Sequence, residues 1–165
     1  MKYTRRKIIG IVLTLALCVG LLPRTYAEAK GEVTCKSLCA TALKATGGGK
    51  KLKYQSTMPI DFGALTYSAR KKVKKMQYIC DAKEVYSLCV IQAKNTKDAK
   101  SLVNTLKKYK KRNCKSNYLS DYSATERKVL KNAVYGRKGN YVWYIAMSSK
   151  KKSNNKGQTA LKKKL

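Results

Sequence analysis

The side chains that could do chemistry in this sequence are a few carboxylates and cysteines, because its 165 residues include no histidine. Histidine is the usual general base at neutral pH and a common zinc ligand. Glu126 has the spacing of a helix cap, Asp98 falls at a predicted helix start, and Asp81 and Glu84 fall in a predicted turn. A pair of acids for glycosidase-type chemistry would therefore have to come from distant segments. We expect a protein that is not an enzyme and that holds no cofactor and no metal.

The cysteines that remain after a predicted N-terminal cleavage are odd in number, which does not favour a disulfide framework. They are Cys35, Cys39, Cys80, Cys89 and Cys114. With "DAKE" as the turn of a hairpin, Cys80 would face Val85, and Cys89 would lie about 13 Å further along the partner strand, beyond the reach of a disulfide. Cys35, Cys39 and Cys89 suit a core as small apolar side chains. A secreted enzyme that uses the thiol of Cys114 or the carboxylate of Asp61 is the alternative.

Lysine dominates the sequence, which has 38 Lys and Arg against 8 Asp and Glu and a formal net charge of +30. Lysine is a hydrated point charge, so an excess of lysine over arginine indicates diffuse attraction to polyanions. The cluster at 107–112 also has a structural explanation, since it would offset the dipole of a helix that ends there. The candidate polyanion contacts are Lys71, Lys72, Lys74, Lys75, Lys107, Lys108, Lys110, Lys111, Arg112, Lys150, Lys151 and Lys152.

The first 29 residues have the three parts of a secretory signal peptide: basic residues, an apolar run and small residues at Ala27 and Ala29. The apolar run is shorter than the roughly 20 residues that span a bilayer, so we expect cleavage after Ala29. Cys18 would be the attachment point of a lipid anchor, but Leu17 precedes it and the chain stays apolar beyond it. The sequence therefore predicts an exported protein, secreted or at the cell surface, without that anchor.

The first predicted element is a helix that ends at the glycines at 47–49. The face that it would bury carries residues at i, i+3, i+4 and i+7, namely Cys35, Leu38, Cys39 and Ala42. Strand-like runs follow at 76–80 and 85–93, after a short helix within "FGALTYSARKK". A further helix should begin near Asn95 or Thr96. Its predicted buried residues are Ala99, Leu102, Val103 and Leu106.

Ser123 and Glu126 have the spacing of a capping box and predict another helix start. "AVYGRKGNYVWYIAMS" then predicts a second hairpin that turns at 138–140. In this hairpin Tyr141, Trp143, Ile145 and Met147 would lie on one side, and Val142, Tyr144 and Ala146 on the other. We expect one α+β domain over 33–147, with an antiparallel sheet of about four strands and helices on one face. The Lys-rich tail, 148–165, is predicted to be disordered.

Three segments, taken in order and spacing, resemble a bacterial family catalogued as domain of unknown function 4358. They are "KEVYSLCVIQAK", "YSATERKVLKNA" and "GNYVWYIAMS", within a likeness that covers about residues 33–147. The resemblance implies an exported or lipid-anchored protein of clostridia-like Gram-positive bacteria with no established activity, so it carries over no catalytic residues. This chain departs from the family's pattern in lacking a good lipid-attachment box and in being far more basic.

Together these features predict a non-catalytic binding or structural module that associates electrostatically with anionic cell-surface material. Wall polymers that bear phosphate and anionic lipid headgroups are the expected partners, and nucleic acid is a less favoured one. A membrane-active cationic protein whose Lys-rich tail docks on anionic lipid is the main alternative.

Overall fold

A five-stranded antiparallel sheet lies between two layers of helices in the computed structural model, which describes residues 33–48 and 52–165. The strands follow the order β1-β2-β3-β5-β4 across the sheet. The α+β prediction is confirmed, whereas Cys18, Ala27 and Ala29 lie outside the described residues. The strands are β1 (Tyr54–Ser56), β2 (Val73–Cys80), β3 (Ser87–Ala93), β4 (Val134–Lys138) and β5 (Tyr141–Ala146). The helices are α2 (Cys35–Thr46), α3 (Tyr67–Arg70), α4 (Thr96–Asn113), α5 (Ser116–Leu119), α6 (Ala124–Lys131) and α7 (Lys151–Lys164), with a 3-10 turn, η2, at Pro59–Asp61.

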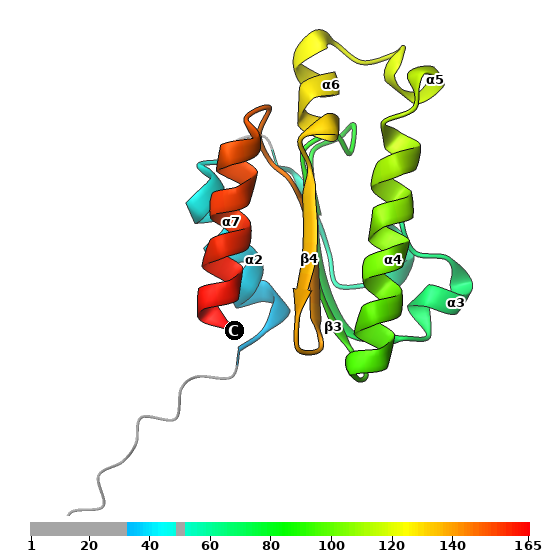
Figure 1. Ribbon diagram of the computed structural model, residues 1–165, viewed down its shortest axis with the longest axis vertical. Helices are drawn as coiled ribbons and strands as arrows, with labels where there is room; N and C mark the ends of the chain where they lie inside the picture. The colour runs from blue at the N-terminus through cyan, green and yellow to red at the C-terminus, as the bar shows by residue number, and fades with distance from the viewer. Residues whose placement is uncertain (1–32, 49–51) are drawn as a thin grey trace, which may run out of the picture. The chain divides into compact units, whose positions relative to one another are not determined.

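Helices cover both faces of the sheet, so the prediction of one covered face is wrong. Helices α2 and α7 pack on one face, and α4, with α3 beside it, packs on the other (Figure 1). The reason lies in β5, where both sets of alternating residues are buried. Trp143 and Ile145 join the cluster under α2 and α7. Val142 and Tyr144 join the cluster under α4. A sheet that is apolar on both faces needs two covering layers.

The first hairpin has a longer loop than predicted. Cys80 pairs with Ser87 rather than with Val85, and the Asp81 backbone N–H donates to the Tyr86 carbonyl at 3.0 Å. This register pairs Cys89 with Tyr78, two positions along the ladder from Cys80. The five cysteines within the described residues are free, as expected for Cys80 and Cys89.

The edge strand β1 was not predicted, which is why the sheet has five strands instead of four. It has three residues and pairs with the end of β2, with Tyr54 opposite Cys80. A strand of three residues is too short to show the alternation of apolar and polar residues by which strands are recognised. It places Tyr54 and Ser56 at the edge of the sheet, beside β2.

Most helix boundaries agree with the sequence signals. The Thr34 hydroxyl caps α2, and Gly47 ends it in the left-handed conformation with φ 69°. Asn95 caps α4, in which Ala99, Leu102 and Leu106 are buried as predicted. Val103 is only half-buried, and the buried Tyr109 extends the same face. The capping box between Ser123 and Glu126 is confirmed.

The tail forms the helix α7, so the prediction of disorder is wrong. Leu161 is fully buried on the sheet. Gly157 lets α7 approach α2 closely, since a Cβ at that position would lie 2.7 Å from Cγ2 of Thr46. The Asn154 side chain accepts from the Met147 N–H at 3.0 Å and donates to the Asn132 carbonyl at 2.9 Å. These three residues, together with Gln158, whose side chain accepts from the Trp143 indole N–H at 3.1 Å, hold a helix whose composition is otherwise that of a solvated tail. Among the described residues no helix is long and apolar enough to cross a membrane.

Candidate anion-binding groove

Of the twelve predicted basic residues, three converge in one groove, three lie at the start of α7 and six lie elsewhere. Lys72, Lys108 and Arg112 line one groove between α3 and α4. Lys150, Lys151 and Lys152 stand at the start of α7, which belongs to the opposite helical layer. The groove is where three of these cations meet hydroxyl-bearing side chains.

We call this hollow the α3–α4 groove; its volume is about 350 Å³. It is lined by three cationic side chains, by four Ser and Thr residues and by Ala64, Ala69 and Tyr109, and no carboxylate lines it. The hydroxyl residues are Thr66, Ser68, Ser101 and Thr105. Cations and hydroxyl donors without a competing acid are the groups that recognise phosphate oxygens.

Hydrogen bonds hold part of the groove in place. The Lys72 ammonium donates to the Ser101 hydroxyl at 2.6 Å and so ties the segment after α3 to α4. The Thr66 hydroxyl accepts from the Ala69 N–H at the start of α3 and lies 3.1 Å from the Ser68 hydroxyl. The donors of the two walls are thus arranged before a ligand arrives, which reduces the entropy lost on binding.

Arg112 is fixed by aromatic rings instead of by acids. Its guanidinium lies 5.3 Å from the ring centroid of Tyr109 and 5.7 Å from that of Tyr118. These cation–π contacts leave the five N–H donors free of any carboxylate in the described part of the chain. Arg112 lines the α3–α4 groove, and its planar fork suits an oxyanion.

The remaining candidates lie outside the groove. Lys110 is half-buried and donates to the Ala133 carbonyl at 2.6 Å, and desolvation by burial lowers its pKa. Lys71 lies over the Tyr67 ring, 4.6 Å from its centroid. Lys107 and Lys111 are exposed on the outer side of α4, while Lys74 and Lys75 belong to β2. The predicted polyanion contacts thus comprise the groove cations and several lysines at other positions.

The hydroxyls were missed, although the sequence carries a signal for some of them. Ser101, Thr105, Lys108 and Arg112 follow one another at i, i+4, i+7 and i+11, so they share one face of α4. A search for clusters of charged residues does not find this face of α4, because two of its four residues are neutral. The contribution of Thr66 and Ser68 depends on the packing of α3 against α4 and has no local signal.

The thiols are poor nucleophiles where they stand. Cys35, Cys39, Cys80 and Cys89 are buried, and desolvation by burial raises the pKa of each. Burial also raises the pKa of the half-buried Cys114, although Lys110 and Lys131 oppose that effect. A thiol with a raised pKa is protonated at neutral pH and unreactive. Within residues 33–48 and 52–165, no three His, Cys, Asp or Glu side chains are arranged to hold a metal ion.

The fold and the groove define a small α+β domain with a cationic cleft on one helical layer. Residues 70–147 match the family model described as domain of unknown function (DUF4358). The match supports the resemblance over β2 to β5 and over α4 to α6, whereas α2, β1 and α7 lie outside it. No curated protein and no solved structure matches the chain.

Proposed function

We propose that this chain is an exported, non-catalytic binding module that holds an anionic, phosphate-bearing polymer of the cell surface through the α3–α4 groove. The observation that carries this proposal is the lining of the groove, in which Lys72, Lys108 and Arg112 stand among four hydroxyl residues without an acid. Such a set offers charge-assisted hydrogen bonds to successive phosphate groups.

The surroundings of the groove favour a polymer over a small anion. Lys107 and Lys111 extend the positive charge along the exposed side of α4, and Lys71 stands beside α3. After the predicted cleavage 33 Lys and Arg remain against 7 Asp and Glu, and this excess concentrates any polyanion near the surface before it reaches the groove. Export is supported by the signal-like first 29 residues. A binding role is supported by the absence of histidine from the sequence and by buried thiols whose pKa is raised by desolvation.

A matched pair of variants tests the groove. Lys72→Gln/Lys108→Gln removes two charges inside it, and Lys36→Gln/Lys97→Gln removes two exposed charges elsewhere. We expect the groove variant to bind a glycerol phosphate oligomer on the order of tenfold more weakly, since each lost charge-assisted hydrogen bond costs about 1 kcal/mol or more. The control should lose less than about twofold. Binding is measured by calorimetry at two salt concentrations, and equal losses in the two variants would contradict the proposal.

Docking on anionic lipid is the second candidate, and the exposed side of α7 favours it. Lys152, Lys156 and Lys163 line one shallow face of this helix. Binding to phosphatidylglycerol vesicles that is unaffected by the groove variant, but lost in Lys152→Gln/Lys156→Gln/Lys163→Gln, would support lipid docking. Substitution is the right test here, because deletion of the tail would remove buried core residues.

A further inference from the structure

A second hollow lies beside the α3–α4 groove and has a different lining. Its volume is about 360 Å³, which falls within the roughly 300–1,000 Å³ of small-ligand sites. It shares Tyr109 and Arg112 with the groove. Its other walls carry aromatic, amide and charged side chains, those of Tyr118, Tyr122, Asn113, Lys83 and Glu84. We call it the tyrosine hollow, because three tyrosines line it.

Three separate segments bring these side chains together. Tyr109 lies on α4, Tyr118 on the short α5, and Tyr122 between α5 and α6. The loop between β2 and β3 supplies Lys83 and Glu84. The ammonium of Lys83 lies 3.2 Å from a carboxylate oxygen at the start of α6, so an ion pair connects this loop to that helix. The walls of the hollow are therefore formed by contacts between segments far apart in the sequence.

Tyr118 presents aromatic surface to solvent at the boundary with the groove. Its side chain is 44% exposed, whereas Tyr109 is buried. The guanidinium of Arg112 lies 5.7 Å from the ring centroid of Tyr118 and 5.3 Å from that of Tyr109. Arg112 lines both the groove and the hollow. A phosphate that Arg112 binds therefore carries its neighbouring group to the ring of Tyr118.

The backbone of Glu84 supplies an independent observation. Its φ is 56°, and in the described part of the chain it is the non-glycine residue with a positive φ. This conformation is unfavourable for a residue with a Cβ, and residues held in it cluster at functional sites. The ion pair within 4.0 Å among the described residues is Lys83–Glu126, so no described cation lies that close to the Glu84 carboxylate. The carboxylate can accept hydrogen bonds from a ligand.

The polar groups of the hollow suit a ligand with several hydroxyl groups. A hydrogen bond from the Asn113 side chain partly offsets the rise that burial causes in the pKa of Tyr109, so this amide lies at the aromatic wall. Each sugar hydroxyl both donates and accepts, and thus matches an amide and a carboxylate. The C–H groups on one face of a sugar ring pack against the negative face of an aromatic ring. A run of stacked bases needs several open aromatic faces, whereas Tyr109 is buried and Tyr122 is partly buried.

We propose that the tyrosine hollow binds a sugar ring linked to the same phosphate polymer that the groove holds. The ring packs on Tyr118, and its hydroxyl groups hydrogen-bond with Asn113 and Glu84. The phosphate next to the sugar is held by Arg112, which lines both sites. The polymer part of this proposal rests on the proposed function, whereas the sugar site itself does not.

The first test compares glycerol phosphate oligomers of equal length, one unsubstituted and one that carries glucosyl groups. Glucose is neutral, so the general attraction of the phosphates to a basic protein is the same for both. We expect calorimetry to show that the glucosylated oligomer binds at least about threefold more tightly. Equal or weaker binding of the glucosylated oligomer by the wild-type protein would overturn the proposal.

Variants then locate the preference. Tyr118→Leu removes the aromatic face and keeps apolar bulk, and Glu84→Gln removes the carboxylate charge without a change of length. Each should abolish the preference for the glucosylated oligomer. Tyr67→Leu is the matched control, because Tyr67 is also exposed, also contacts a cation, Lys71, and lines neither the groove nor the hollow. A preference that persists in Tyr118→Leu and Glu84→Gln, or that disappears in the control as well, would contradict the assignment to this hollow.

Glu84→Gly separates binding from folding. Glycine adopts a positive φ freely, so the melting temperature should stay the same or rise, while the preference for the glucosylated oligomer is lost. A preference that survives this substitution would contradict the role of Glu84 in binding, whatever the stability of the variant.

The second test separates failure of the hollow from failure of the groove. Methyl glucoside carries no phosphate, so it reports on the hollow alone. In an NMR titration at millimolar concentration we expect saturable shifts of the Asn113, Tyr118 and Glu84 amides, unchanged in Lys72→Gln/Lys108→Gln. This outcome would support the sugar site even if neither oligomer bound. No shifts, or equal shifts with cyclohexanol or adenine, would overturn it.

Discussion

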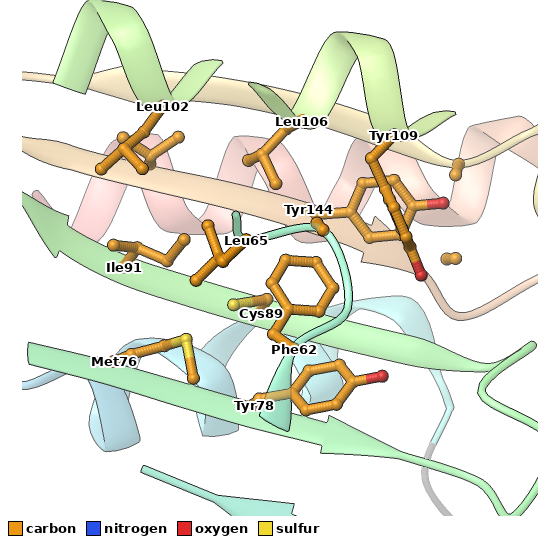
Figure 2. Packing of buried hydrophobic residues seen from close by; sticks show 14 of the residues in the cluster. Phe62, Leu65, Met76, Tyr78, Cys89, Ile91, Leu102, Leu106, Tyr109 and Tyr144 are labelled. Carbon is orange, nitrogen blue, oxygen red and sulfur yellow. The ribbon is translucent and has the colours of Figure 1, made fainter. Parts of the chain in front are cut away.

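Two buried tyrosine hydroxyls at one end of the sheet have no nitrogen or oxygen atom as a hydrogen-bond partner, and the groups that surround them differ. The hydroxyls of Tyr78 and Tyr144 are both buried and both point toward the same end of the sheet (Figure 2). The Tyr78 hydroxyl has the Cys80 thiol beside it, a weak hydrogen-bonding group. Tyr144 faces the Tyr109 ring at 5.3 Å and lines no described pocket. Its buried hydroxyl therefore lowers the stability of the folded state.

At the residue scale we predict that Tyr144→Phe raises the free energy of unfolding by about 1 kcal/mol. The variant keeps the ring and removes a buried polar group that has no partner. Urea unfolding gives the value. Tyr118→Phe, whose ring is exposed, should change stability by less than about 0.5 kcal/mol. A loss of stability in Tyr144→Phe would show that its hydroxyl has a partner.

At the scale of elements, α7 is attached by contacts that few of its residues make. Its lysines face solvent, whereas Asn154, Gly157 and Leu161 are buried. Gly157 is the point of closest approach to α2, between Thr46 and the Ala42 carbonyl. The helix therefore depends on the absence of a side chain at that position, although glycine is a poor helix former.

Gly157→Ala tests this dependence. Alanine favours a helix by about 1 kcal/mol, but the added Cβ would lie 2.7 Å from Cγ2 of Thr46, so we expect a net loss of about 1–3 kcal/mol. The loss should be partly recovered in Gly157→Ala/Thr46→Ser, which removes the clashing methyl group. Asn155→Ala, at an exposed position of the same helix, should be neutral or slightly stabilising. Thermal and urea unfolding measure all three. A Gly157→Ala variant as stable as the wild type would mean that α7 packs more loosely than described.

At the scale of the whole molecule, the positive charge destabilises the folded state, which is stabilised by the apolar clusters on the two faces of the sheet. A formal net charge of +30 repels itself in the compact state, and Lys83–Glu126 is the ion pair of the described residues that relieves it. The stabilising contribution comes from two apolar clusters, one on each face of the sheet. Anions in solution should therefore affect stability more than they do for a neutral protein.

We predict that the melting temperature rises by a few degrees between about 20 and 300 mM NaCl, because salt screens the repulsion between lysines. Calorimetry measures the rise. The variant Lys36→Glu/Lys97→Glu, which lowers the net charge at exposed positions, should show a smaller rise. A melting temperature that does not respond to salt would indicate that the lysines are too far apart to repel one another.

The sequence by itself determined the local features. Caps and hydrophobic periodicity located α2, α4, α6 and both hairpins, because the signals lie within one turn of helix or one strand. The cations of the groove were also among the residues predicted from charge. Tertiary structure decided what depends on distant segments: the second helical layer, the order of α7, the Ser87 register, and the meeting of Tyr118 with Glu84 in the tyrosine hollow. These features are set by packing between elements, and packing leaves no periodic signal in the segment that takes part in it.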